Sequence, residues 1–247
     1  KIDVQNSSTL REARAILEPI KPIHFPIAFP EVFLSRSEGF NVILGNPPWE
    51  ETVVNEDKFW ARYNPGLSSL PPGDQESLKN TLKEKRPDLV IELKKELDQA
   101  KLDRDFLHTG NFPGMSTGDP DLYKAFLWRF WSLSSKNHGR IGVVMPRSAL
   151  SAKGSEKFRR NLFTSVKSID VTTLENKKKW VFDIHPQYTI AIVSILKTIN
   201  LSNNFITLKG PFDSLKSFIS GKDIQSKKFN INDILGWNES VSLPLIP

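Results

Sequence analysis

The residues Asn46-Pro47-Pro48-Trp49 form the part of the sequence best suited to chemistry. The two prolines fix φ and remove two backbone N–H donors, so the carbonyls around them are left as acceptors. The side-chain oxygen of Asn46 adds another acceptor, and Trp49 adds a flat aromatic wall. A small pocket that is rich in acceptors and has one flat wall suits an amine attached to a planar ring.

The exocyclic amine of adenine is such a group, and it is a poor nucleophile because its lone pair is delocalised into the ring. The Asn46 side chain and the Pro47 carbonyl would hold its two hydrogens and favour the pyramidal nitrogen that attacks a methyl sulfonium. Trp49 would stack on the base, which must leave the duplex to enter the pocket. The structural alternative is a strand that ends in a proline-rich turn, with Trp49 in the core.

A strand must end at Asn46 to position these groups, and residues 40–45 predict one. This short apolar run is bounded by glycines, and it is typical of a parallel strand buried on both faces. Ligands of open α/β sheets bind beyond the carboxyl ends of such strands. An aromatic helix over 121–133 and a buried strand over 141–146 continue the α/β pattern. The remaining predictions are a helix over 155–166 and strands over 169–174, 188–196 and 205–208.

The N-terminal residues and the segment after Trp49 have different patterns. A helix is predicted over 9–17, with Ser8 or Thr9 as its N-cap. Four prolines predict an extended arm up to Phe33, which is pinned by aromatic residues. Residues 50–118 read as a helical insertion, with helices over 75–85 and 87–106 between loops that are rich in Pro and Gly.

The composition indicates a soluble globular protein with a basic surface. The chain has 247 residues and a formal net charge of +6, which suits a polyanionic partner such as nucleic acid. No apolar run approaches the roughly 18 residues of a membrane span. The absence of cysteine fits a cytoplasmic location, and four scattered histidines give no ligand spacing, so we expect no metal site.

Several motifs in order resemble those of the adenine-N6 DNA methyltransferases. Residues 42–49 resemble motif IV, and residues 24–33 with 39–42 are similar to the lead-in of large bacterial restriction-modification and phage-defence enzymes. Downstream, 121–127 resembles motif V, 139–146 resembles motif VI and 181–183 resembles motif VIII. The resemblance spans roughly residues 22 to 196.

The resemblance implies the second half of a Rossmann-like, S-adenosylmethionine-dependent methyltransferase fold. This catalytic domain would cover 39–200, after an N-terminal helix and arm over 1–38, and would hold a mixed sheet with an antiparallel strand near its end. Its substrate would be double-stranded DNA, and a nuclease or specificity domain would be fused to it or act as a partner. The implied roles are catalysis by Asn46, Pro47, Pro48 and Trp49, base stacking by Trp49 and Phe182, and cofactor contacts by Asn46, Pro48 and Phe126.

Each of these assignments has a structural alternative. Phe126 lies on an aromatic helix, where the core is its ordinary place. The run Lys177, Lys178 and Lys179 is predicted to contact DNA phosphates, although such runs are usually solvated faces. The same two interpretations apply to the basic residues Lys153, Lys157, Arg159 and Arg160.

The sequence also departs from the family pattern. The glycine-rich motif I and the acidic residue that binds the cofactor ribose are absent, and the chain begins at Lys1 rather than Met. We therefore expect a fragment that is inactive alone, with 201–247 as the start of a target-recognition region. Two alternatives remain: a non-catalytic DNA-binding or scaffold domain that keeps the fold, and a methyltransferase acting on protein glutamine or RNA.

Overall fold

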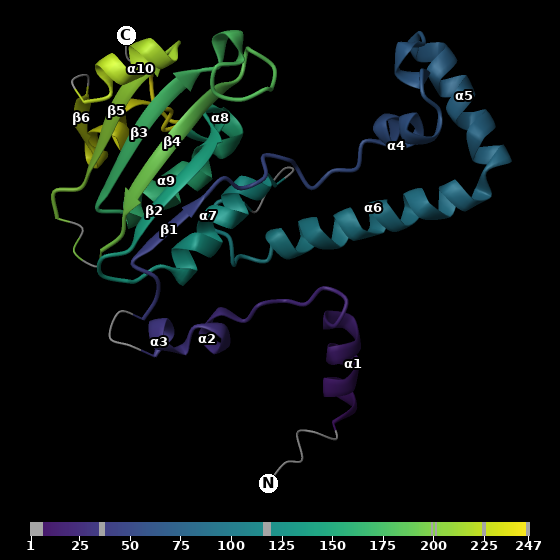
Figure 1. Ribbon diagram of the computed structural model, residues 1–247, viewed down its shortest axis with the longest axis horizontal. Helices are drawn as coiled ribbons and strands as arrows, with labels where there is room; N and C mark the ends of the chain where they lie inside the picture. Colours follow the sequence, from purple (N-terminus) through teal and green to yellow (C-terminus); the bar gives the residue numbers. More distant parts are fainter. Residues whose placement is uncertain are drawn as a thin grey trace.

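The chain forms an α/β structure built on a mixed sheet (Figure 1). The computed structural model describes residues 7–34, 38–115, 120–198, 200, 202–223 and 226–245. Within these residues six strands are hydrogen-bonded in the order β1-β2-β4-β3-β5-β6. The strands are β1 (Val42–Gly45), β2 (Arg140–Pro146), β3 (Ser168–Glu175), β4 (Thr189–Leu196), β5 (Phe205–Phe212) and β6 (Lys227–Asn230).

The strand directions bring several strand ends to one edge of the sheet. β1 is parallel to β2, and β3 is parallel to β5, whereas β4 lies between β2 and β3 and is antiparallel to both. The predicted mixed sheet is confirmed, and the antiparallel strand expected near the end of the 39–200 region is β4. Consequently β1, β2, β3 and β5 end at the same edge, and β4 begins there.

One face of the sheet is covered by helices and holds the main core. Alternate residues of β2 and β4, such as Val143 and Val193, point into this core together with Phe158 and Leu162 of a covering helix. The predicted aromatic helix and the helix that follows β2 are confirmed here. The covering helices are α7 (Leu122–Leu133), α9 (Glu156–Ser165) and α11 (Ile231–Trp237), with α8 (Ser148–Ser151) and the 3-10 turn η3 (Lys153–Ser155) between β2 and α9.

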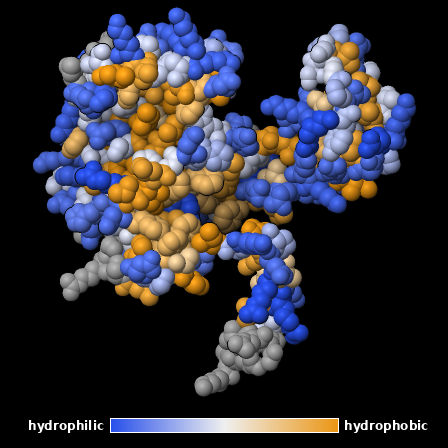
Figure 2. Space-filling model, viewed as in Figure 1, coloured by the Kyte–Doolittle hydropathy of each residue, from blue (hydrophilic) through white to orange (hydrophobic). Residues whose placement is uncertain are grey.

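The opposite face is covered only near the carboxyl ends of the strands, where Phe218 of α10 (Leu215–Gly221) packs on a smaller cluster. Ile192 in the middle of β4 is 39% exposed on this face. Figure 2 shows hydrophobic surface over the sheet. The chain therefore has one full helical layer among its described residues.

The prediction that the strand before Asn46 is buried on both faces is wrong. Val42 is 56% exposed and Leu44 is 78% exposed. β1 is the edge strand of the described sheet, and none of the described helices covers the face to which Leu44 belongs. An apolar run indicates that a strand can be buried, whereas its actual burial depends on the strands and helices that pack against it.

The N-terminal residues form three helices. The predicted first helix is α1 (Ser8–Leu17), although its N-cap is Ser7 rather than Ser8 or Thr9. The extended arm is corrected to two single-turn helices, α2 (Phe25–Ala28) and α3 (Pro30–Phe33). Their prolines stand in the first turn, where a missing N–H breaks no helical hydrogen bond. The arm is pinned as predicted, because the rings of Phe25, Phe29 and Phe33 all pack on Phe40.

The segment between β1 and β2 leaves the sheet as a helical excursion, which projects to one side in Figure 1. Both predicted helices are present, as α5 (Pro72–Lys85) and α6 (Pro87–Leu107), and the structure adds α4 (Glu56–Tyr63) and the 3-10 turn η2 (Leu67–Ser69). The excursion has its own apolar cluster around Trp60, Leu67 and Leu93. None of the described helices is long and apolar enough to cross a membrane.

The C-terminal residues are continuous with the sheet in this structure. The region 201–247, predicted to begin a target-recognition region, supplies β5, β6, α10 and α11. After α11, Val241 and Leu243 reach the main core. Arg159 fixes this tail: it is fully buried and donates to the carbonyls of Ala149 (3.0 Å), Ser240 (2.5 Å) and Val241 (2.9 Å). The prediction that Arg159 is a surface basic residue is therefore wrong.

Burial lowers the pKa of Arg159 to about 10, which leaves its guanidinium charged at neutral pH. We expect Arg159→Met to lower the free energy of unfolding by about 3 kcal/mol, because two buried carbonyls and one partly buried carbonyl lose their donor. The matched change Arg160→Met should cost less than about 1 kcal/mol, since that guanidinium is exposed. Urea unfolding of both variants measures the difference, and equal losses would contradict the assignment.

Candidate functional site

The candidate site lies at the edge where β1, β2 and β3 end. Asn46 directly follows β1, and residues 176–188 connect the end of β3 to the start of β4 at the same edge. Residues 46–49 and 182–184 together line a cavity of about 380 Å³. This volume falls within the roughly 300–1,000 Å³ of small-molecule sites. The fold thus brings together two segments that are far apart in the sequence.

The acceptor groups of the first segment have no partners within the described parts of the chain. Asn46 and Pro48 are exposed and Pro47 is buried. Neither the Asn46 side-chain amide nor the Pro47 carbonyl takes part in a hydrogen bond with a described residue. Both residues line the cavity, and neither acceptor is engaged by another described residue.

Trp49 is held in place by the neighbouring strand. Its indole Nε1 donates to the carbonyl of Val144 at 3.4 Å, and its ring packs against both the main core and the cluster around Leu174. The ring is half-buried and lines the cavity. Trp49 therefore combines the two interpretations of the sequence, because it packs in the core and also forms a wall of the cavity.

Phe182 meets Trp49 across the cavity. The two ring centroids are 6.4 Å apart and the ring planes are at 88°, which is an edge-to-face contact. A parallel pair of walls, expected for a base held between the two rings, is thus not formed in this structure.

Sequence reasoning missed two residues of this loop. Tyr188 is 51% exposed, and its ring centroid lies 6.4 Å from that of Trp49. Asn176 is fully buried, and its side-chain amide makes hydrogen bonds with the backbone of the loop, for example with the carbonyl of Phe182. Because an apolar run follows Tyr188, the sequence pattern assigns the tyrosine to the strand rather than to the loop. A lone asparagine at the end of a strand gives no signal in the sequence, since its partners are backbone groups of the loop, which carry no residue-type pattern.

Phe126 lies on α7 near the end of β1. It is 40% exposed and packs edge-to-face on Phe130, with the centroids 6.2 Å apart. The Phe130 ring in turn covers Gly45, the residue before Asn46, where a Cβ would lie 2.7 Å from it. Phe126 is therefore a surface ring beside the first segment of the site, rather than the core residue that its aromatic helix suggested.

The predicted phosphate-binding lysines form the exposed 3-10 turn η4 (Lys177–Lys179). Lys177 is paired with Glu175 and Lys179 with Asp183, each at 2.7 Å. The hydrogen bond to Glu175 raises the pKa of Lys177, so its ammonium stays charged. The positive charge of this turn is partly neutralised by its own neighbours, which a count of lysines does not reveal.

A polar cavity of about 430 Å³ lies beside the site, at the start of α7. Lys124 is nearly buried there and pairs with Asp121 at 2.6 Å, and the Tyr123 hydroxyl donates to the same carboxylate at 3.1 Å. Burial, together with the charge of Asp121, raises the pKa of Tyr123 and keeps the phenol protonated. These groups satisfy one another and stabilise the start of α7.

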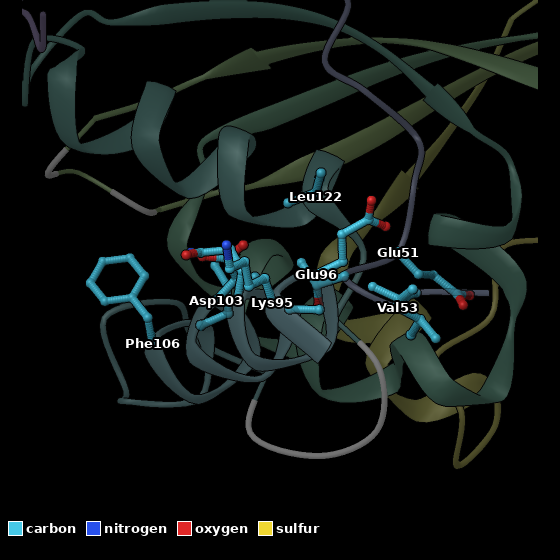
Figure 3. A pocket seen from close by; sticks show the side chains of 12 residues that line it. Glu51, Val53, Lys95, Glu96, Asp103, Phe106 and Leu122 are labelled. Atoms are coloured by element: carbon cyan, nitrogen blue, oxygen red, sulfur yellow. The ribbon is translucent and has the colours of Figure 1, made fainter. Parts of the chain in front are cut away.

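A larger hollow, about 750 Å³, lies elsewhere, between α6 and residues 51–54 (Figure 3). Glu51, Glu96 and Asp103 are among the residues that line it, which makes it unsuited to a polyanion. Its lining has one amide, Gln99, which donates to Asp103, and one aromatic ring, Phe106, whereas the smaller cavity has two aromatic rings in contact. Within the described ranges, no group of three or more His, Cys, Asp or Glu side chains is placed to hold a metal ion.

Comparison with known proteins gives similarities of fold. No protein-family model matches the chain, and no curated protein gives a significant match. Among solved structures, a chain of a DrdV–DNA complex matches at 14% identity with a TM-score of 0.49, over 81% of this chain and 18% of that chain. The ATP-dependent Type ISP restriction-modification enzyme LlaBIII bound to DNA matches at 15% identity and a TM-score of 0.41, over 81% of this chain and 12% of that one.

A modification subunit of a putative type I restriction enzyme from Vibrio vulnificus YJ016 matches at 15% identity and a TM-score of 0.42. That match covers 85% of this chain and 37% of the subunit. All three matches are at low identity and have TM-scores below 0.5. The chain spans well under half the length of each of these three proteins.

Gly45 offers a test of the packing that positions Asn46 and Phe126. We expect Gly45→Ala to lower the free energy of unfolding by about 1–3 kcal/mol, because the added methyl group meets the Phe130 ring at 2.7 Å. Gly154→Ala is the matched control, since a Cβ there has no neighbour within 4 Å. Thermal unfolding of both variants gives the comparison. An unchanged stability in Gly45→Ala would show that Phe130 does not restrain this strand end.

Proposed function

We propose that this chain forms the target-base pocket of an S-adenosylmethionine-dependent methyltransferase that modifies adenine N6 in double-stranded DNA. The observation that supports the proposal most directly is the pair of unpartnered acceptors, Asn46 and the Pro47 carbonyl, beside the ring of Trp49. The motif order of the sequence, including Phe182 in the loop opposite, supports the same assignment. A restriction-modification or phage-defence system is the proposed setting.

The acceptors would act on the amine of a flipped adenine. The Asn46 oxygen and the Pro47 carbonyl accept its two hydrogens, which draws the nitrogen lone pair out of conjugation and makes it nucleophilic. Because both acceptors are fixed at the end of β1, they need no reorganisation as charge develops. Trp49 receives the face of the base, and its bond to Val144 keeps the ring from turning away.

Some residues of the chain fit the cofactor and others that it requires are missing. Asn46 and Pro48 are exposed at the strand end, and Phe126 presents an exposed ring nearby, which suits the adenine of S-adenosylmethionine. When bound, this cofactor supplies the methyl group. The sequence before residue 39 has no glycine-rich strand-to-helix turn, so we propose that most of the cofactor site is built by residues outside this sequence.

DNA would approach over the loop of residues 176–188. The ion pairs of Lys177 and Lys179 reduce the charge available for phosphates, whereas a phosphate can replace either carboxylate as the partner. Base extrusion is aided by aromatic rings that receive the base, here Trp49, Phe182 and Tyr188. We therefore assign the loop to the DNA-facing surface and the lysines to its edge.

Asn46→Ala in the full-length protein should lower kcat for adenine-N6 methylation by about 100- to 1,000-fold, because one preorganised polar group is lost. The control is Asn41→Ala, which changes an exposed asparagine at the other end of the same strand. Transfer of labelled methyl groups to an unmethylated plasmid measures the rate. Full activity of Asn46→Ala would refute the assignment.

The two alternative functions give different results in the same assay. A scaffold domain leaves the plasmid unmodified and gives no binding in a titration of the full-length wild type with S-adenosylmethionine. A methyltransferase that acts on protein glutamine or RNA binds the cofactor and labels a glutamine peptide or an RNA rather than the plasmid. Labelling of the plasmid at adenine N6 excludes both.

A further inference from the structure

The loop that carries Phe182 is a long connection that needs an internal restraint. It spans residues 176–188 between β3 and β4, and most of its residues are exposed. Long surface connections are ordinarily more mobile than the strands that they join. A ring that lines a binding cavity has to stay within a narrow range of positions.

Asn176 provides that restraint. Its side chain is fully buried and uses both ends of its amide. Oδ1 accepts hydrogen bonds from the backbone N–H groups of Val181 (3.2 Å) and Phe182 (3.1 Å). Nδ2 donates to the carbonyls of Phe182 (2.9 Å) and Ile184 (3.4 Å). An amide offers two donor hydrogens and two lone pairs, so all four are engaged within this loop.

Phe182 makes more hydrogen bonds with the Asn176 side chain than any other residue of the loop. Its backbone N–H and its carbonyl are both bound by Asn176, so the peptide groups on its two sides are fixed to one buried side chain. The backbone of Asn176 is itself tied to the sheet, since its N–H donates to the carbonyl of Tyr188 at 3.1 Å. The Cα of Phe182 is thus positioned relative to the strand ends rather than to the solvent-exposed turn.

The intervening turn explains why such a restraint is needed. Lys178 and Lys179 both have φ of 57°, a left-handed conformation that side chains with a Cβ adopt at an energetic cost. Consecutive residues of this kind persist only where their surroundings hold them. The four hydrogen bonds of Asn176 close the turn and hold it in this conformation.

We infer that Asn176 is a positioning residue for the target-base pocket, which acts through Phe182 and has no contact with the base itself. This inference rests on the proposed function, since it assigns Phe182 to the same pocket. No other described asparagine is fully buried, and the partners of Asn176 are all backbone groups of the loop.

The activity test is a double-mutant cycle in the full-length protein. Asn176→Ala and Phe182→Ala should each lower kcat/KM for DNA methylation by roughly 5- to 150-fold, the range that corresponds to the stacking of one base on an aromatic ring. The double variant should be no worse than Phe182→Ala alone, because Asn176 acts only through that ring. Multiplicative losses would overturn the inference.

Asn176→Asp separates positioning from a general loss of packing. Its shape is unchanged and it keeps the acceptors for Val181 and Phe182, but it loses both donors and places a carboxylate against two carbonyls. Burial raises the pKa of such a carboxyl, and the neutral acid can donate one hydrogen bond. The loss of kcat/KM in Asn176→Asp relative to wild type should therefore become smaller as the pH falls from about 8 to about 6. A deficit that does not change with pH would contradict this geometry.

Hydrogen exchange tests the loop without reference to catalysis. In the protein free of DNA, the amides of Val181 and Phe182 should exchange faster in Asn176→Ala than in wild type. The control is Asn161→Asp, an exposed asparagine of α9 whose amide donates only to the carbonyl of Lys157 at 2.7 Å. Unchanged exchange at both amides overturns the inference, whatever the activity. Absence of methylation by the wild type overturns the proposed function instead, and the two failures are distinguishable.

Discussion

The parallel pairing of β1 with β2 is the constraint on which the candidate site depends. The register sets Gly45 opposite Val143, so the chain leaves β1 beside the last residues of β2. Trp49 then reaches back to the carbonyl of Val144 and fixes the direction of the segment that follows Asn46. A slip of one residue in this pairing would turn every side chain of β1 to the other face and remove the indole from its acceptor.

The antiparallel strand β4 supplies the second half of the site. Because β4 runs against both of its neighbours, the connection that enters it must start at the edge where β3 ends. That edge is also where β1 and β2 end. An all-parallel order would have required a crossover to the opposite edge, and Phe182 would not have met Trp49. The topology, more than any single contact, explains why residues that are distant in the sequence line one cavity.

Much of this arrangement is predictable from the sequence, and the failures have physical causes. The strands β2 and β4 are long apolar runs, and the sequence predicts each of their bounds to within one residue. The exposure of Leu44 could not be predicted, because it depends on the absence of a neighbour among the described residues. The buried role of Arg159 depends on the carbonyls of Ser240 and Val241, which are distant in the sequence, so no local pattern encodes it. The ion pairs of the lysine turn and the hydrogen bonds of Asn176 are local, but they depend on the conformation of the loop, which the residue types alone do not specify.

The apolar cluster of the helical excursion has a consequence for how this fold tolerates change. Trp60 and Leu93 pack with their own neighbours rather than with the sheet, so residues between β1 and β2 gain stability independently of the strand pairing. Lengthening such a connection adds only about 0.6 kcal/mol of closure entropy for each doubling. A change of length within the excursion is therefore expected to leave the geometry around Asn46 largely unaltered.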